Sequence, residues 1–113
     1  MKTGLELWRR QLRQPQHSFA ATQDFIERNY HYQPTQFRNG SLVNRAGENP
    51  GSCKILALAL LEQLSDEEAL LAFGEHYRHV LDTPEGNDHQ NIRQLLQHGL
   101  AGVVFVSSAL HRL

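Results

Sequence analysis

Residues 53–61 constrain the fold of this chain more than any other segment. They are apolar at almost every position, with Lys54 as the exception. A helix with apolar residues on every side is not stable at a surface, so this segment predicts a helix at the centre of a core. The rest of the chain must then supply amphipathic elements that surround it.

Two helices are expected before this segment. Leu5, Trp8 and Leu12 recur at helical spacing and predict a short amphipathic helix near the N-terminus. Ser18 is the expected N-cap of a second helix. That helix should end before Pro34, because the residue that precedes a proline is disfavoured in helical conformation.

Two more helices are expected after the central segment. Ser65 and Glu68 form a capping-box pattern, which predicts the start of a helix that continues through Gly74. A glycine inside a helix costs about 1 kcal/mol relative to alanine, so Gly74 predicts a close approach of another element. Asp88 is the expected N-cap of the last helix, and Gly99 stands at its expected C-terminal end.

Residues 37–43 and 103–106 are the candidates for β-structure. Asn39-Gly40 is typical of a type I′ turn, which would pair residues 37–38 with 42–43. A coil packed on the helices is the alternative. Residues 103–106 are β-branched and apolar, and we see a strand partner for them only in residues 37–43. The predicted fold is mainly α, a single-domain helical bundle of about five helices with at most this short β element.

Length and composition agree with one domain over residues 1–113. The apolar fraction is 40% and the charged fraction 20%, which are ordinary values for a globular protein. The net charge is −1, so the chain has no long-range attraction for nucleic acid or anionic membranes. No apolar run approaches the roughly 20 residues that span a bilayer. We therefore expect neither nucleic acid nor a membrane as a partner.

The single cysteine, Cys53, has no disulfide partner in the chain, which favours folding in the cytoplasm. A thiol at the start of a helix can act as a nucleophile, here with Lys54 lowering its pKa, His89 as base and Asn91 as orienting group. The alternative is a small buried residue of the core. The sequence does not decide whether the chain is an enzyme.

The seven histidines raise the question of a metal site. His76 and His79 stand three residues apart on one predicted helix and could bind a single ion. Glu75, His89 or His98 could complete such a site. The alternative is that both histidines are solvated surface residues, and we expect no cofactor.

Residues 44–54 form the densest polar segment, and they lead directly into the central helix. The N-terminus of a helix offers free N–H groups and a partial positive charge, which bind anions. The spacing of the glycines and Lys54 is not that of a nucleotide-binding P-loop. Arg78 and Arg93 could form a fork for a carboxylate or phosphate. The alternative, which we favour, is that they pair within the chain, with the asparagine-rich loop or with Asp82 and Asp88, and hold the fold.

These features together predict a polar pocket around residues 44–54, 77–78 and 89–93. Its ligand would be a small anionic molecule or a segment of a protein. The expected pocket residues are Asn39, Asn44, Asn49, Ser52, Cys53, Lys54, Tyr77, Arg78, His89, Asn91 and Arg93.

Five motifs make the sequence similar to the HopJ family of type III effectors. They are Tyr32-x-Pro34-Thr35-x-Phe37-x-Asn39-Gly40, Asn44-x-Ala46-Gly47-x-Asn49-x-Gly51-Ser52-Cys53-Lys54-Ile55, Phe73-Gly74-x-x-Tyr77-Arg78, Pro84-x-Gly86-x-x-His89-x-Asn91-Ile92-Arg93 and Gly99-x-x-Gly102-x-x-Phe105. The motifs extend over most of the chain, from about residue 19 to 110. Leu100 stands where a tryptophan is expected in this family, which alters a packing residue.

The resemblance implies a bacterial protein whose relatives include effectors of plant pathogens. It is expected in the bacterial cytoplasm, with delivery into host cells by a type III system as the family name implies. Similar proteins of bacteria without an obvious host leave a housekeeping role open. The resemblance carries no established reaction or ligand, so a host protein, a bacterial protein and a small anionic ligand all remain candidate partners.

Overall fold

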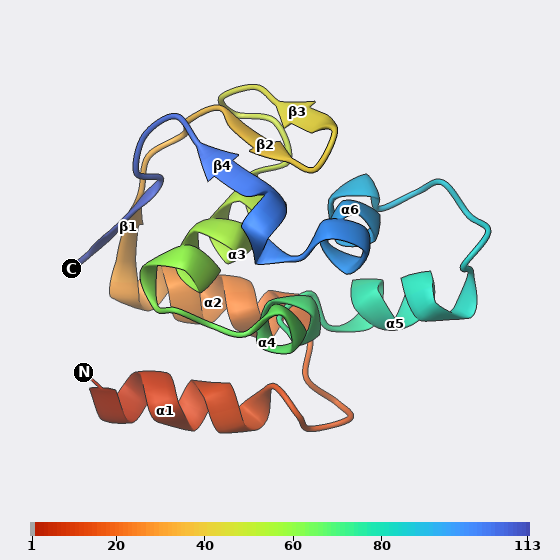
Figure 1. The fold of residues 1–113 in the computed structure, drawn as a ribbon. Coiled ribbons are helices and arrows are strands. Elements are labelled where there is room, and N and C mark those ends of the chain that lie inside the picture. The colour runs from red at the N-terminus through yellow and green to blue at the C-terminus, as the bar shows by residue number, and fades with distance from the viewer. Residues whose placement is uncertain (1) are drawn as a thin grey trace.

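The structure is a computed structural model that describes residues 2–113. Within this range the chain forms six α-helices, one short 3₁₀ helix and five strands (Figure 1). The helices are α1 (Lys2–Gln11), α2 (Phe19–Asn29), α3 (Pro50–Leu61), α4 (Asp66–Leu71), α5 (Glu75–Asp82), α6 (Gln90–His98) and the 3₁₀ helix η1 (Leu100–Gly102). The strands are β1 (Tyr30–Tyr32), β2 (Phe37–Asn39), β3 (Leu42–Asn44), β4 (Val103–Phe105) and β5 (Leu110–Arg112).

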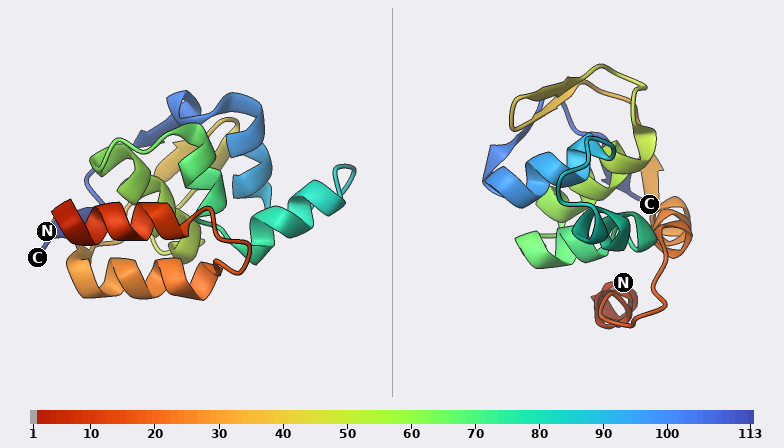
Figure 2. Two further views of the ribbon diagram at one scale, coloured as in Figure 1. Left: turned by 90° about the horizontal axis from the view of Figure 1, so that it is seen from below. Right: turned by 90° about the vertical axis from the view of Figure 1, so that its right-hand side faces the viewer.

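Helix α3 lies at the centre of the molecule, as the sequence predicts. Its residues Ile55, Leu56 and Leu58 have no exposed surface. Helices α2 and α4 lie on one side of α3, and the three-stranded sheet lies on the other (Figure 1). Figure 2 shows α1 at the periphery and α5 projecting from the body. Among residues 2–113, no helix is long and apolar enough to cross a membrane.

The predicted β element is present as an antiparallel sheet of order β3-β2-β4. Phe37 pairs with Asn44 on one side and with Phe105 on the other, so the expected partners are confirmed. The hairpin turn lies one residue later than the type I′ expectation. Gly40 has a φ of 60° and is the only one of the two turn residues with positive φ, which corresponds to a type II′ turn.

A second sheet, β1 with β5, was not predicted. Its register aligns Tyr30 with Arg112 and Tyr32 with Leu110. The sequence favours a helix up to Pro34, yet α2 ends at Asn29 and the chain becomes extended at Tyr30. The partner strand is at the other end of the chain, so no local pattern indicates this pairing.

The predicted single helix through Gly74 is in fact two helices, α4 and α5. The capping box of Ser65 and Glu68 is confirmed at the start of α4. Gly74 has a φ of 58° and stands at the N-cap of α5. A Cβ atom at Gly74 would lie 2.5 Å from the backbone nitrogen of Phe19. The close approach expected at this glycine is therefore the contact with the start of α2, and it breaks the helix.

Gly74→Ala should lower the free energy of unfolding by about 2–4 kcal/mol, because alanine combines the left-handed strain with a backbone clash. Urea denaturation followed by circular dichroism measures the change. Gly4→Ala is the matched control, since a Cβ at Gly4 meets no atom within 4 Å and the position is helical. It should raise stability by about 0.5 kcal/mol. Equal effects of the two substitutions would contradict the account of Gly74.

Candidate functional site

Three buried asparagines connect the hairpin, the segment before α3 and the start of α6. Asn39 Nδ2 donates to Asn91 Oδ1 at 3.0 Å and to the Asn91 carbonyl at 2.8 Å. Asn44 and Asn91 exchange two amide hydrogen bonds of 3.2 and 3.0 Å. Asn39 and Asn44 have no exposed surface, and Asn91 is 5% exposed. We call these three residues the asparagine network.

The asparagine network extends to the residue that begins α3. Asn49 Nδ2 donates to Asn44 Oδ1 at 2.7 Å, and Asn49 is the N-cap of α3. Asn91 is the second residue of α6. The network therefore fixes the starts of two helices relative to each other.

A pocket of about 490 Å³ opens between these two helix starts. Its apolar walls include Phe19 and Phe73, whose ring centroids are 6.4 Å apart. Its polar side is supplied by the first residues of α3 and α6. The lining residues are Phe19, Leu42, Asn49, Gly51, Ser52, Phe73, His76, His89, Gln90, Asn91 and Ile92.

The helix starts at this pocket lack side-chain caps within residues 2–113. The first backbone bond of α3 runs from Cys53 N to Asn49 O, so the N–H groups of Gly51 and Ser52 precede the helical ladder. The first bond of α6 runs from Ile92 N to His89 O, which likewise leaves the N–H groups before it outside the ladder. The pocket is thus lined by backbone donors that the helices themselves do not use.

The N-cap residues on both sides of the pocket have left-handed backbones. Asn49 has a φ of 47° and His89 a φ of 51°. Residues other than glycine seldom adopt this conformation, and such strain clusters at binding sites. The sequence predicts Asp88 as the N-cap of α6, but the N-cap is the next residue, His89. The Asp88 side chain instead binds Arg93 and His79.

The two arginines pair within the chain, which is the favoured alternative, and do not form an anion-binding fork. Arg78 donates to the carbonyl of His17 at 3.0 Å and links α5 to the turn before α2. Arg93 donates to the Thr83 carbonyl at 2.8 Å and to Asp88 Oδ1 at 2.6 Å, and so holds the turn between α5 and α6. Both guanidinium groups are engaged within the chain, and neither lines the pocket.

Cys53 is part of the core. It is 1% exposed, and burial raises the pKa of its thiol despite the Tyr32 hydroxyl beside it. The Lys54 ammonium lies 4.8 Å from the centroid of the Tyr32 ring, and Lys54 does not line the pocket. The geometry therefore corrects the interpretation of Cys53 as a nucleophile that Lys54 activates.

Of the predicted pocket residues, Asn49, Ser52, His89 and Asn91 line the pocket. Asn39 and Asn44 do not line the pocket, but they form hydrogen bonds with Asn91 and Asn49, which do. Tyr77 is half-buried against the core and does not line it.

Some pocket residues escaped the sequence analysis. Phe19 and Phe73 read as core residues of two different helices, and Gln90 reads as an ordinary surface residue. Gly51 matters because a Cβ there would lie 2.5 Å from Phe19 Cζ. No sequence pattern places Phe19 beside the start of α3. Its position directly after the N-cap Ser18 indicates only that it lies at the start of α2.

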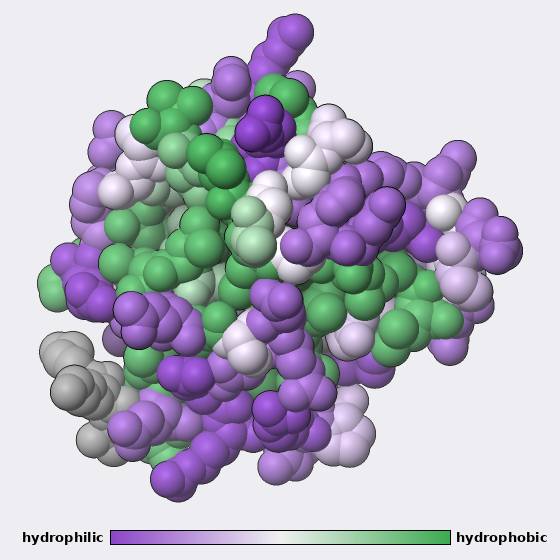
Figure 3. All heavy atoms as spheres, in the orientation of Figure 1, coloured by the Kyte–Doolittle hydropathy of each residue, from purple (hydrophilic) through white to green (hydrophobic). Residues whose placement is uncertain are grey.

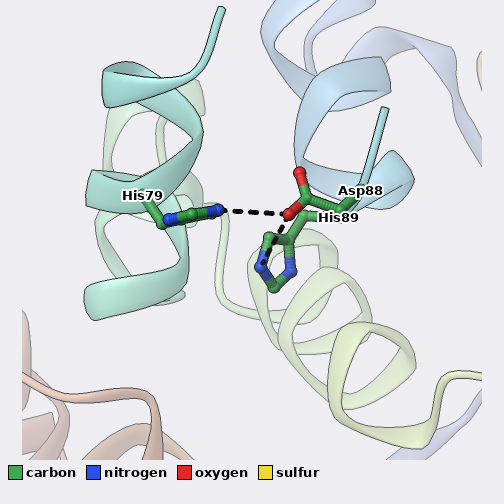
Figure 4. Close-up of side chains that lie close together, drawn as sticks. All are labelled: His79, Asp88 and His89. Atoms are coloured by element: carbon green, nitrogen blue, oxygen red, sulfur yellow. Dashed lines mark hydrogen bonds and ion pairs between the residues drawn. The ribbon is translucent and has the colours of Figure 1, made fainter. Parts of the chain in front are cut away.

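The histidines partly meet the expectation of a shared site (Figure 4). His79 Nε2 lies 3.1 Å from Asp88 Oδ2, and His89 Nε2 lies 4.0 Å from the same oxygen. The ring of His76 is 5.0 Å from that of His89. Glu75, an expected member of the histidine site, is not part of the cluster, and its Oε1 accepts a 2.8 Å hydrogen bond from Phe19 N. His98 is on the opposite end of α6, beside Gly40.

Two other hollows differ from this pocket in chemistry. One, of about 580 Å³, contains charged groups that are already paired, such as Arg112 with Glu62 at 2.9 Å. The other, of about 380 Å³, has mostly apolar walls, including Leu60, Phe105 and Leu110. Figure 3 shows apolar atoms gathered over the end of α3 and β4 on that face. Neither hollow has two helix starts in its wall.

Comparison with known proteins gives one family and one close structure. The model for the HopJ type III effector protein family matches residues 5–110. A solved structure described as "Crystal structure of unknown function protein VPA0580" is 44% identical, with a TM-score of 0.90. The match covers 96% of this chain and 93% of that one. No curated protein matches the chain.

The thiol of Cys53 should be inert in the native protein and reactive after unfolding, because burial keeps it from reagents and raises its pKa. Alkylation by iodoacetamide at neutral pH, measured by mass spectrometry with and without denaturant, tests this. We expect the native rate to be at least about 100-fold lower than the denatured rate. A native thiol that reacts as fast as that of the unfolded chain would contradict the burial of Cys53 and support its role as a nucleophile.

Proposed function

The chain belongs to the HopJ type III effector family, and from this premise we propose that it is a binding module whose ligand joins an anionic group to an apolar part. The ligand is a small molecule or a segment of a host or bacterial protein. The observation that carries the proposal is the meeting of two uncapped helix starts, those of α3 and α6, in one pocket.

The electrostatics of the helix starts favour an anion. Each helix N-terminus carries the equivalent of roughly half a positive charge, and its unpaired N–H groups point along the axis. An anion beside Gly51 and Gln90 would accept hydrogen bonds from both helices. Phosphate and carboxylate groups bind at single helix starts in many proteins, and two starts add their fields.

The start of α2, which is also near the pocket, is occupied by groups of the chain itself. The Ser18 hydroxyl accepts from Ala21 N. Glu75 Oε1 accepts from the N–H of Phe19, the first residue of α2. Helices α3 and α6 thus contrast with α2, and their free donors are what a ligand would use.

The apolar part of the ligand would contact Phe19 and Phe73. The ring of His76 lies 4.8 Å from that of Phe19 in an edge orientation, and so extends the aromatic wall. A pocket with mostly apolar walls and a few fixed polar donors is the usual form of a ligand site. The donors fix the orientation of the ligand, and burial of its apolar part supplies much of the affinity.

Phenyl phosphate is a suitable probe because it combines a dianion with a ring. Titration followed by ¹H–¹⁵N correlation spectra should shift the amides of Gly51, Ser52, Gln90 and Asn91. Ser52→Asp should weaken binding at least tenfold, because a carboxylate then occupies the anion position and repels the probe.

Ser108→Asp is the matched control, since it adds the same charge at an exposed serine outside this pocket. It should leave the affinity within about twofold of the wild type. Binding that Ser108→Asp and Ser52→Asp weaken equally, or shifts confined to other amides, would contradict the proposal.

A further inference from the structure

His79, Asp88 and His89 bring three metal-ligating side chains to one point (Figure 4). One ligand atom from each lies within 4.8 Å of the other two. His79 comes from α5, while Asp88 and His89 come from the end of the following turn. Both imidazoles are directed at one oxygen of the same carboxylate. The three groups therefore converge from two elements.

The carboxylate is held in this position from its other side. Arg93 Nη2 donates to Asp88 Oδ1 at 2.6 Å, which leaves Oδ2 facing the histidines. Metal-bound carboxylates are commonly fixed by such a second hydrogen bond. Asp88 Oδ2 is thus oriented toward the histidines before any ion arrives.

We propose that His79, Asp88 and His89 bind a divalent first-row transition metal ion such as Zn²⁺. Two imidazoles and one carboxylate are ligands that zinc prefers, whereas Mg²⁺ and Ca²⁺ take oxygen ligands almost entirely. Water completes the coordination, because His79 and Asp88 are each 52% exposed at the side chain.

The distances from the two imidazoles to the carboxylate require little movement. Zinc bonds of about 2.0–2.2 Å in a tetrahedral arrangement place ligand atoms about 3.3 Å apart. The 3.1 Å separation of His79 and Asp88 already fits this value. His89 must approach by less than an ångström from its 4.0 Å separation, and its side chain is 32% exposed.

The metal site is separate from the proposed anion pocket in its chemistry. It uses side chains of α5 and the following turn, whereas the pocket uses backbone donors of α3 and α6. His89 is the only one of the three metal ligands that also lines the pocket. The phenyl phosphate titration is done without metal, so each idea can fail while the other stands.

Untagged full-length protein, stripped with a chelator and dialysed, provides the test. Isothermal titration with Zn²⁺ should give one ion per chain, and Co²⁺ should give the visible absorption of a low-coordinate site. His79→Ala, His89→Ala and Asp88→Asn should each weaken zinc binding at least tenfold. His79→Ala alters an exposed helix position, so its fold is expected to be retained, and circular dichroism checks this.

His98→Ala is the matched control and should leave zinc affinity unchanged, because this exposed histidine lies outside the cluster. His31→Ala is a second control, because His31 is aligned with His111 between β1 and β5 and neither histidine belongs to the cluster. Absence of zinc binding, or a loss caused by His31→Ala and not by His79→Ala, would overturn the proposal.

Discussion

The buried amide contacts among Asn39, Asn44 and Asn91 hold together the elements that surround the candidate pocket. Buried polar groups are costly unless they are hydrogen-bonded, so amides without solvent must find partners among themselves. The amide groups of Asn39, Asn44 and Asn91 connect β2, β3 and α6 in this way, and Asn39 also donates to the Asn91 carbonyl. Within residues 2–113, Asn39 Oδ1 is the one oxygen of these three amides without a partner. The pairing fixes one arrangement of the three elements, since another register would leave amides unpaired.

The same interactions explain how a strained pocket persists. Asn49 is held in its left-handed conformation by its bond to Asn44, and this sets where α3 begins. Asn91 sets where α6 begins, directly after the left-handed His89. Two helix starts then face one hollow with unused N–H groups. The asparagines that the sequence suggests as ligand contacts are therefore largely the frame of the pocket, and the backbone supplies its donors.

Local sequence signals predict much of this fold. The apolar run in α3, the caps at Ser18 and Ser65, and the hairpin partners are all found in the structure. These features depend on neighbouring residues, which a pattern can reveal. The errors concern long-range contacts: β1 pairs with the end of the chain, and the break at Gly74 arises from Phe19, far away in sequence.

The candidate site shows the same division. The polar segment before α3 and the residues around His89 do come together, because both lie at helix starts that the sequence marks. Arg78 and Arg93 pair within the chain, as the favoured alternative expects, and do not form an anion-binding fork. The partners His17 and Thr83 are revealed only by the tertiary structure. Asp88 reads as a helix cap, yet the turn between α5 and α6 directs it at His79.

The most direct test of this account is amide hydrogen exchange in Asn91→Ala, with the exposed Asn87→Ala as control. The account predicts that Asn91→Ala lowers the free energy of unfolding by about 2–4 kcal/mol, because it leaves buried amides unpaired. Residues 37–44 and 90–98 should lose protection together, while α2 retains its own. A loss within about 0.5 kcal/mol, as for Asn87→Ala, with unchanged protection in the hairpin, would show that the asparagine network does not organise the site.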